Sequence, residues 1–534
     1  MTGKQLVVAG GGHNGLVAAI LAAGAGYHVT LLERSDHVGG ASVGEAVFAG
    51  HDVRLSRYSY LVSLFPDELM RRLGISVRLL SRPVSSYTPL RRGGKDTGLL
   101  VERVPAADTA ASMRALTGSD TEFASWQQLY GELSSMAGVM APMLTGPLRR
   151  RSQARDAVIG AAGSTIWTDV FEQPIGEMIT RRLTDDAVRG VVATDGLIGT
   201  HASLLDENLL ANRCFVYHLI GRGTGEWLVP AGGMGALADG LAARAVDAGV
   251  DIRCGIEVVE VDEGPTAVTV IGRDRDGQSV EVTGSQLLAA VAPAVVEGWL
   301  GRDSEPVVGA QMKINMLLKR LPRMASGADP VTAFAGTTHL REGFDELEAA
   351  YRVSAAGALP DPVPSEVYCH SLTDASILGN AADGSLATLT LFGLHTPVEL
   401  FRADPVAAKK QAADAALASL QEYLAEPLAD CLALDTDGRP CLDIASPLDV
   451  QASVGMPGGN IFHGDLSWPF AEDDEELDSP AARYGVAVAG SERILLAGAG
   501  SRRGGGVSGL GGAAAVDALL ESALLTSGRL HHRR

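Results

Sequence analysis

The chain has 534 residues, of which 46% are hydrophobic and only 5% aromatic, and it contains 64 glycines. Acidic residues outnumber basic ones by 64 to 44, which gives a formal net charge of −20. This length provides for two or three domains with substantial cores. The charge balance excludes nucleic acid as a main partner, because phosphate binding needs a basic surface.

A glycine-rich turn follows the first predicted strand. Residues 6–9 predict a short buried strand, and residues 17–23 predict a helix. Between them, Gly10, Gly12 and Gly15 fill the three glycine positions of the dinucleotide fingerprint. These glycines allow a tight turn, backbone approach to a pyrophosphate and close helix–strand packing. The N-terminus of the predicted helix would offer free N–H groups to that pyrophosphate.

A second predicted strand, residues 27–32, leads directly into Glu33. A carboxylate at this position accepts hydrogen bonds from both ribose hydroxyls of an adenosine and repels a 2′-phosphate. Strand, helix, strand and acid in this order predict a Rossmann-type dinucleotide site. The alternative is a glycine-rich turn that serves packing alone.

The middle of the chain returns to alternating strand and helix patterns. Residues 225–235 form a glycine-rich stretch before a helical pattern, and residues 251–261 alternate as a strand does. Asp276-Gly277 lies between two β-branched runs and predicts a hairpin. Residues 287–291 predict a buried strand that returns to a sheet.

Two further glycine features distinguish a flavin dinucleotide from a nicotinamide one. Gly39 and Gly40 come soon after Glu33, where backbone approaches the diphosphate of an extended FAD. Near the other end of the chain, a predicted strand at 494–497 leads through a glycine-rich turn into a predicted helix at 513–525. This turn supplies a second helix N-terminus, which we expect to face the flavin end.

The fold class predicted from these elements is α/β, with a discontinuous Rossmann-type FAD-binding domain and an α+β mixed-sheet substrate domain. The FAD-binding domain is predicted to consist of residues 1–80, 226–300 and 486–534, and the substrate domain of residues 81–225 and 301–485.

The sequence resembles the phytoene-desaturase-like FAD oxidoreductases nearly from end to end, and most closely the branch of pyridine nucleotide-disulfide oxidoreductase domain-containing protein 2. Seven segments carry this resemblance: residues 10–19, 33–41, 56–60, 230–235, 313–315, 458–464 and 504–509. It implies non-covalent FAD, the two-domain fold and removal of hydride from carbon. The cofactor-binding residues predicted from the motifs and the resemblance together are Gly10, Gly12, His13, Asn14, Gly15, Glu33, Arg34, Gly39, Gly40, Ala41, Val258, Gly500, Gly506, Val507 and Ser508.

The chain departs from the family pattern at two places. Ala41 stands where carotenoid desaturases and amine oxidases often have an arginine, so that diphosphate contact is absent or supplied elsewhere. Arg502-Arg503 replaces the His-Pro that usually precedes the last glycine turn in this branch, so a flavin-side role of that histidine does not transfer.

Three residues are the predicted catalytic candidates. Arg502, with Arg503 as the second choice, is expected to stabilise the reduced flavin because it lies in the cofactor turn, unless it points to solvent. His463 is expected to handle a proton, with a structural histidine as the alternative. Tyr60 is expected to line the substrate side.

The predicted function is an FAD-dependent dehydrogenase, oxidase or desaturase that removes hydride from a carbon of a largely apolar small molecule. O2, a quinone or another acceptor is expected to reoxidise the flavin, since the sequence contains no second nicotinamide fingerprint. Two alternatives stay open: a flavin amine oxidase, and a non-redox isomerase or interaction protein with structural FAD.

Cysteine content and hydropathy bear on location. The five cysteines are scattered without CxxC spacing, so neither a disulfide framework nor a metal site is predicted. The first strand begins within a few residues of Met1, and no run approaches about 18 apolar residues. These features predict a cytoplasmic protein and leave peripheral membrane contact and a homodimer open.

Overall fold

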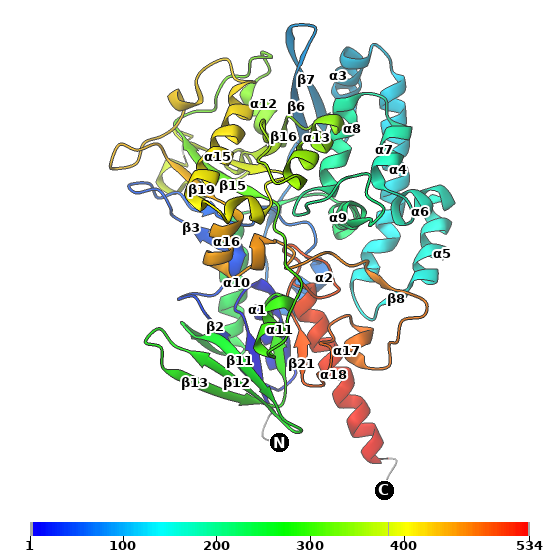
Figure 1. The fold of residues 1–534 in the computed structure, drawn as a ribbon, viewed down its shortest axis with the longest axis vertical. Helices are drawn as coiled ribbons and strands as arrows, with labels where there is room; N and C mark the ends of the chain where they lie inside the picture. Colours follow the sequence, from blue (N-terminus) through cyan, green and yellow to red (C-terminus); the bar gives the residue numbers. More distant parts are fainter. Residues whose placement is uncertain (1–3, 383, 532–534) are drawn as a thin grey trace.

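The computed structural model describes residues 4–382 and 384–531, and its elements form three regions (Figure 1). A parallel five-stranded sheet with α1, α10, α11 and α18 occupies the lower part of the view, together with a small antiparallel sheet. A seven-stranded mixed sheet lies above it on one side, and a group of helices lies above it on the other.

The parallel sheet has the strand order β10-β2-β1-β14-β21 and draws its strands from three distant segments of the chain. Its buried strands alternate between two cores: Leu6 and Val8 face one, and Val7 and Ala9 face the other. Burial of both faces is typical of a parallel sheet covered by helices. The bounds of the strands are β1 (Gln5–Ala9), β2 (His28–Glu33), β10 (Asp251–Cys254), β14 (Leu287–Ala289) and β21 (Ile494–Leu496).

The predicted hairpin at Asp276-Gly277 is confirmed, with Gly277 at φ +76° in the turn between β12 and β13. The prediction of one strand over residues 251–261 was wrong. Gly255 has φ +75° and breaks the run, so β10 joins the parallel sheet and β11 joins the small antiparallel sheet. The bounds of that sheet are β11 (Glu257–Glu263), β12 (Val268–Arg273) and β13 (Ser279–Gly284).

The mixed sheet has the order β19-β15-β18-β17-β16-β6-β7, and only the β16–β6 pairing is parallel. One face of it packs on α15, as Leu389 and Leu391 meet Ala412 and Ala416 in one buried cluster. The bounds are β6 (Val84–Arg92), β7 (Lys95–Glu102), β15 (Met312–Leu318), β16 (Thr337–Leu340), β17 (Ser365–Tyr368), β18 (Ala387–Gly393) and β19 (Leu442–Ala445).

The helical region is built around a large apolar core that contains Trp126, Trp167, Phe171 and Phe215. Its helices are α3 (Ala107–Thr117), α4 (Thr121–Met140), α5 (Arg151–Ala162), α6 (Ser164–Phe171), α7 (Ile175–Arg182), α8 (Asp186–Ala193) and α9 (Leu210–Leu219). Together with the two sheets, this region shows the predicted α/β architecture of a Rossmann-type domain plus a mixed-sheet domain. The exact domain boundaries stay a prediction.

The remaining elements connect these regions. The helices are α1 (His13–Gly24), α2 (Asp67–Leu73), α10 (Gly233–Asp247), α11 (Pro293–Trp299), α12 (Pro330–Phe334), α13 (Phe344–Ala355), α14 (His370–Thr373), α15 (Pro405–Gln421), α16 (Pro447–Val454), α17 (Pro480–Arg483) and α18 (Leu510–His531). The short strands are β3 (Gly44–Glu45), β4 (Leu55–Ser56), β5 (Leu79–Leu80), β8 (Arg149–Arg150), β9 (Val229–Pro230) and β20 (Phe470–Ala471).

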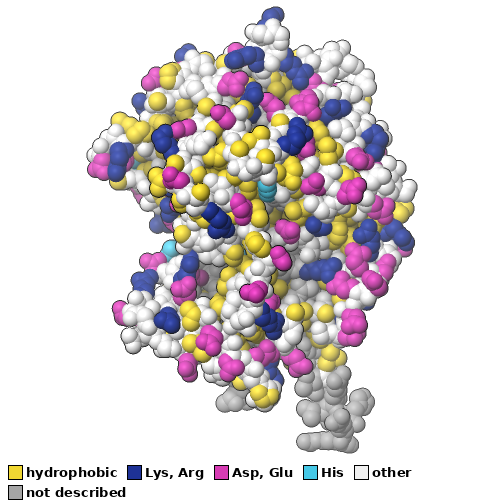
Figure 2. Space-filling view, viewed as in Figure 1, with side chains coloured by type: hydrophobic (Ala, Val, Ile, Leu, Met, Phe, Trp, Pro, Cys, Tyr) yellow, Lys and Arg dark blue, Asp and Glu magenta, His cyan; other side chains and the backbone are white. Residues whose placement is uncertain are grey.

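The surface carries charges of both signs. On the face shown in Figure 2, Lys and Arg side chains are interspersed with Asp and Glu. Within residues 4–382 and 384–531, no helix is long and apolar enough to cross a membrane.

Helix α1 is buried along most of its length, because α10 and α18 both pack against it. A Cβ added at Gly512 of α18 would lie 2.1 Å from the carbonyl oxygen of Asn14 in α1. Gly512→Ala should therefore force the two helices apart and lower the free energy of unfolding by roughly 1–3 kcal/mol.

Thermal and urea unfolding measure this effect. Gly240→Ala in α10 is the matched control, since its Cβ would meet nothing within 4 Å. A helix interior gains about 0.5–1 kcal/mol from this exchange where space permits. Equal stability changes in the two variants would contradict the close packing of α1 on α18.

Candidate functional site

The glycines after β1 hold the turn into α1. Gly10 has φ +98°, and a Cβ there would lie 2.8 Å from the carbonyl oxygen of Ala290. At Gly15 a Cβ would lie 1.9 Å from the carbonyl oxygen of Gly10. Helix α1 begins after Gly12, which has no side chain to cap the first N–H groups. The turn therefore presents free backbone donors at a helix N-terminus.

Glu33 ends β2 beside this turn. Its Oε2 accepts a 2.7 Å hydrogen bond from the backbone N–H of Gly11, and its Oε1 accepts one of 2.7 Å from the N–H of Ser35. These bonds fix the carboxylate on the wall of the cavity described below. Arg34 lies on the same wall, and its guanidinium donates to the carbonyl oxygens of Ala452 and Ser453.

The second glycine pair packs directly on the first turn. The N–H of Gly39 donates a 2.8 Å hydrogen bond to the carbonyl oxygen of Gly11. Gly40 has φ +56°, and a Cβ there would lie 3.0 Å from the Cα of Gly12. At Ala41 the carbonyl oxygen accepts hydrogen bonds from the N–H and the hydroxyl of Ser59.

The C-terminal glycine turn completes the same wall. Gly506 has φ +69° and lines the same cavity as His13, so residues some 490 positions apart lie on one wall. Gly500 serves packing, since a Cβ there would lie 2.3 Å from the Cδ of Pro293. Ser508 is buried, and its hydroxyl accepts a hydrogen bond from the N–H of Leu510 at the start of α18.

These turns surround one elongated cavity of about 360 Å³, which we call the flavin cavity. Of the predicted cofactor residues, Gly10, Gly12, His13, Asn14, Glu33, Arg34, Gly40, Ala41, Val258, Gly506 and Val507 line it. The other four, Gly15, Gly39, Gly500 and Ser508, lie behind the wall and shape its turns.

A second cavity of about 410 Å³, the inner cavity, meets the flavin cavity at shared residues. Tyr60, Leu61, Ile198, His218 and Trp227 line both cavities. One part of the inner wall is apolar or aromatic, formed by Val101, Trp126, Tyr130, Leu133 and Leu219. Another part is polar and includes Arg82, Asp195, His339 and Glu366.

Tyr60 lies at the junction of the two cavities. Its ring centroid is 4.6 Å from that of Tyr368 and 4.7 Å from that of Phe392. Burial raises the pKa of the Tyr60 hydroxyl far above its usual value, so the phenol stays protonated. This position agrees with the expectation that Tyr60 lines the substrate side of the site.

Lys313 is a site residue that the sequence reasoning did not assign to catalysis. It lies on β15, and its Nζ donates to the carbonyl oxygens of Ser56 at 2.7 Å and Tyr58 at 2.9 Å. The Nζ is 5.2 Å from the centroid of the Tyr60 ring. Burial holds the pKa of this amine well below its usual value. The sequence feature that could have identified Lys313 as a site residue is its place inside the otherwise nearly apolar run of residues 312–318.

His463 and His13 both line the flavin cavity. Burial lowers the pKa of each to about 4, and the charge of His463 lowers that of His13 further. Both imidazoles are therefore neutral at pH 7. His463 has φ +66°, and the structure gives its Nδ1 no hydrogen-bond partner among the described residues.

The side chains of the two arginines in the C-terminal turn bind other protein groups and not the flavin cavity. Arg502 donates to Glu475 and, at 2.8 Å, to the carbonyl oxygen of Phe470. Arg503 is 2% exposed and donates to backbone carbonyl oxygens, among them that of Tyr484 at 2.7 Å. Neither lines the flavin cavity. The role of Arg502 toward a reduced flavin stays a prediction, without a contact that favours it.

The lining of the flavin cavity fits FAD in its donors and acceptors. The Oδ1 of Asn14, both amide atoms of Gln311 and the Nδ1 of His463 are buried and lack partners within the described part of the chain. Buried polar atoms are normally hydrogen-bonded. A polar, elongated cofactor would satisfy them, with its pyrophosphate at the α1 N-terminus and its ribose hydroxyls at Glu33.

Comparison with known proteins agrees with this geometry. The family model described as FAD dependent oxidoreductase matches residues 5–97. An uncharacterized protein of Mycobacterium tuberculosis, Rv0897c, is 45% identical over 525 residues, with 97% of each chain covered. Pyridine nucleotide-disulfide oxidoreductase domain-containing protein 2 of Mus musculus is 27% identical over 559 residues, covering 95% of this chain and 91% of the mouse protein.

Solved structures share the fold. An oxidoreductase from Methanosarcina mazei matches with a TM-score of 0.56 at 13% identity, covering 97% of this chain and all of the other. Cyclohexylamine oxidase from Brevibacterium oxydans matches with a TM-score of 0.54 at 15% identity, covering 98% of this chain and all of the other.

Glu33→Ala should weaken FAD binding by roughly 10- to 100-fold, because it removes charge-assisted hydrogen bonds to the ribose hydroxyls. Titration of the apoprotein with FAD, followed by quenching of flavin fluorescence, measures the dissociation constant. The exposed Glu281→Ala on β13 is the control. If both variants bind FAD as the natural protein does, Glu33 does not hold the ribose.

Stability is expected to fall as the pH drops from 6.5 towards 4, with His463 among the groups responsible. The unfolded chain binds a proton near pH 6.5 that the folded site excludes until about pH 4. One such group contributes a slope of up to about 1.4 kcal/mol per pH unit in this window.

Urea unfolding between pH 7 and pH 5 measures this slope. It should be shallower in His463→Gln, whereas the exposed His28→Gln should keep the natural slope. A His463→Gln slope equal to the natural one would show that this imidazole is not held neutral by the fold.

Proposed function

Since this chain belongs to the FAD-dependent oxidoreductase family, we propose that it removes a hydride from a carbon of a small, largely apolar molecule. The reacting carbon would lie where the flavin cavity meets the inner cavity, beside Tyr60. Bound FAD supplies the chemistry of this step by accepting two electrons as a hydride.

The observation that carries the proposal is the set of residues shared by the two cavities. Five residues line both cavities and would contact a molecule that extends from one into the other: Tyr60, Leu61, Ile198, His218 and Trp227. This junction is lined mainly by apolar and aromatic side chains, which exclude water from the reacting carbon. The apolar part of the inner wall suits the body of such a substrate.

We propose a phytoene-desaturase-like outcome, in which loss of a hydride and a proton from adjacent carbons forms a double bond. Lys313 is our candidate for handling the proton. Its Nζ lies beside the Tyr60 ring, and burial lowers its pKa, which favours the free amine that accepts a proton. His463, also neutral, is the second candidate.

Amine oxidation is the second candidate function. The observation in its favour is the aromatic wall of Tyr60 and Phe392, whose rings lie 4.7 Å apart on the flavin cavity. Aromatic faces attract amines in their cationic form. Cyclohexylamine oxidase, by its name an enzyme that oxidises an amine, shares the fold.

Anaerobic mixing of the holoprotein with candidate molecules separates these functions. The proposal expects a small, largely apolar molecule such as an isoprenoid to bleach the visible flavin band, whereas bleaching by alkyl amines alone would favour the second function. Recovery of colour with oxygen identifies an oxidase, and recovery only with a quinone identifies a dehydrogenase. Conversion of a substrate without any bleaching would contradict both functions and favour a non-redox role.

Lys313→Met should lower the rate of flavin reduction by roughly 100-fold or more, because the step loses its proton acceptor. The flavin content should stay unchanged, and stopped-flow absorbance measures the rate. The exposed Lys319→Met, one residue beyond the end of the same strand, is the control. Equal rates in both variants would remove Lys313 from the chemistry.

A further inference from the structure

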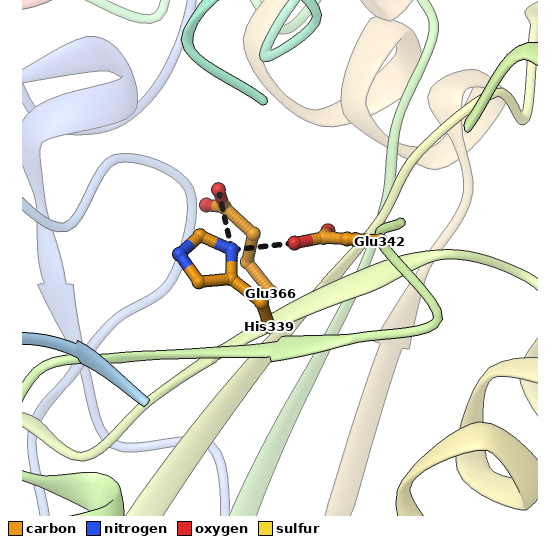
Figure 3. A group of neighbouring side chains, drawn as sticks. All are labelled: His339, Glu342 and Glu366. Atoms are coloured by element: carbon orange, nitrogen blue, oxygen red, sulfur yellow. Dashed lines mark hydrogen bonds and ion pairs between the residues drawn. The ribbon is translucent and has the colours of Figure 1, made fainter. Parts of the chain in front are cut away.

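Three ligand-type side chains meet at the polar end of the inner cavity. His339 Nδ1 lies 2.5 Å from Oε2 of Glu342 and 3.8 Å from Oε1 of Glu366. Figure 3 shows the imidazole between the two carboxylates, with Glu342 pointing at the ring from the adjoining turn. One oxygen or nitrogen from each residue lies within 4.8 Å of the others.

The mixed sheet fixes this arrangement. His339 on β16 and Glu366 on β17 are direct partners in the antiparallel register, so their side chains leave the same face of the sheet next to each other. Glu342 lies three residues after His339, just beyond the end of β16. The group is therefore held by paired backbone and not by a loop alone.

The group holds more buried carboxyl groups than neighbouring cations. The side chains of Glu342 and Glu366 are 0% and 2% exposed. Within the described residues, no lysine or arginine forms an ion pair with either carboxylate, and Asp195 adds a third carboxylate whose charge reaches His339 and Glu366. Arg82 is a nearby cation that interacts with Glu366. Burial raises the pKa of Glu366 to about 8 and that of Glu342 well above its usual value, so these carboxyls are neutralised either by protons or by a further cation.

The second carboxylate oxygen of Glu342 gives independent evidence that a binding partner of this group is missing. This buried Oε1 has no hydrogen-bond partner in the part of the chain that the structure describes. The second oxygen of Glu366, in contrast, accepts a hydrogen bond from the hydroxyl of Tyr368. Such support from a neighbouring hydroxyl is typical of carboxylates that bind metals.

We propose that His339, Glu342 and Glu366 bind a divalent transition-metal ion of the first row. One imidazole and two carboxylates suit Mn²⁺, Fe²⁺ or Zn²⁺. Bonds of about 2.0–2.2 Å place ligand atoms roughly 3.0–3.5 Å apart. His339 and Glu342 need to separate by less than about 1 Å, and His339 and Glu366 lie close to the required distance already.

The ion would face the inner cavity, because His339 and Glu366 both line it. Three protein ligands leave a coordination position open, as in sites that bind water or a substrate oxygen. Asp195 lies on the same wall. The ion would therefore hold the oxygen-bearing end of a molecule whose apolar body extends towards Tyr60. The metal site itself does not depend on the proposed oxidation.

Binding of Mn²⁺ to the holoprotein tests the proposal without any substrate. After removal of metals with a chelator, titration followed by the electron paramagnetic resonance signal of free Mn²⁺ should show one ion bound per chain. Zn²⁺ should displace it, since nitrogen and oxygen sites prefer Zn²⁺ to Mn²⁺. Failure of both ions to bind at millimolar concentration would overturn the proposal and leave protons as the balancing charge.

Two nearly isosteric variants locate the ion. Glu342→Gln and Glu366→Gln should each weaken Mn²⁺ binding at least about tenfold. Glu348→Gln is the matched control, because Glu348 is also buried and hydrogen-bonded, to Ser203 and Leu204, away from the group. The flavin spectrum and the melting temperature report folding.

If one of the two variants fails to fold, the other decides. Unchanged affinity in a folded Glu342→Gln or Glu366→Gln variant would overturn the assignment, since the ion would then bind elsewhere. An equal loss of affinity in Glu348→Gln would also overturn it, because the loss would then follow from any buried substitution.

Discussion

The cofactor site depends on how closely backbone packs around the start of α1. Gly10, Gly15 and Gly40 allow contacts there that a side chain would prevent, and Gly512 lets α18 lie against the same helix. His13 and Gly506 lie on the same cavity wall, so the first and last glycine turns meet there. The flavin cavity therefore depends on the close approach of the two ends of the chain.

The inner cavity differs from the flavin cavity in the elements that form it. The flavin cavity is formed by turns at the ends of parallel strands, where free backbone donors meet a phosphate. The inner cavity is formed by the mixed sheet and the helical region, and two of its polar groups, His339 and Glu366, come from paired strands. Tyr60 stands between these two environments, so it is placed to contact both cofactor and substrate.

The cofactor half of the site was predictable from sequence, because short-range patterns specify it. A glycine-rich turn between a strand and a helix, with an acidic residue at the end of the next strand, is a local pattern typical of a dinucleotide site. The strand break at Gly255 was not foreseen, since residues 251–261 keep their alternation across it. Arg502 shows the limit of position alone: it lies in the cofactor turn, yet its side chain pairs with Glu475. Lys313 had a local signal in the nearly apolar run of residues 312–318, but its place in the site depends on strand pairing between distant segments. The pair His339–Glu366 depends on such pairing as well.

We propose that FAD spans the flavin cavity in one direction, with its adenosine at Glu33 and its reactive ring beside Tyr60 and Lys313. The electron density of the holoprotein in a crystal tests this most directly. Our account predicts density for a non-covalent FAD with its pyrophosphate at the N-terminus of α1 and its ring at the junction of the two cavities. Density for the ring at Glu33, or outside the flavin cavity, would contradict it.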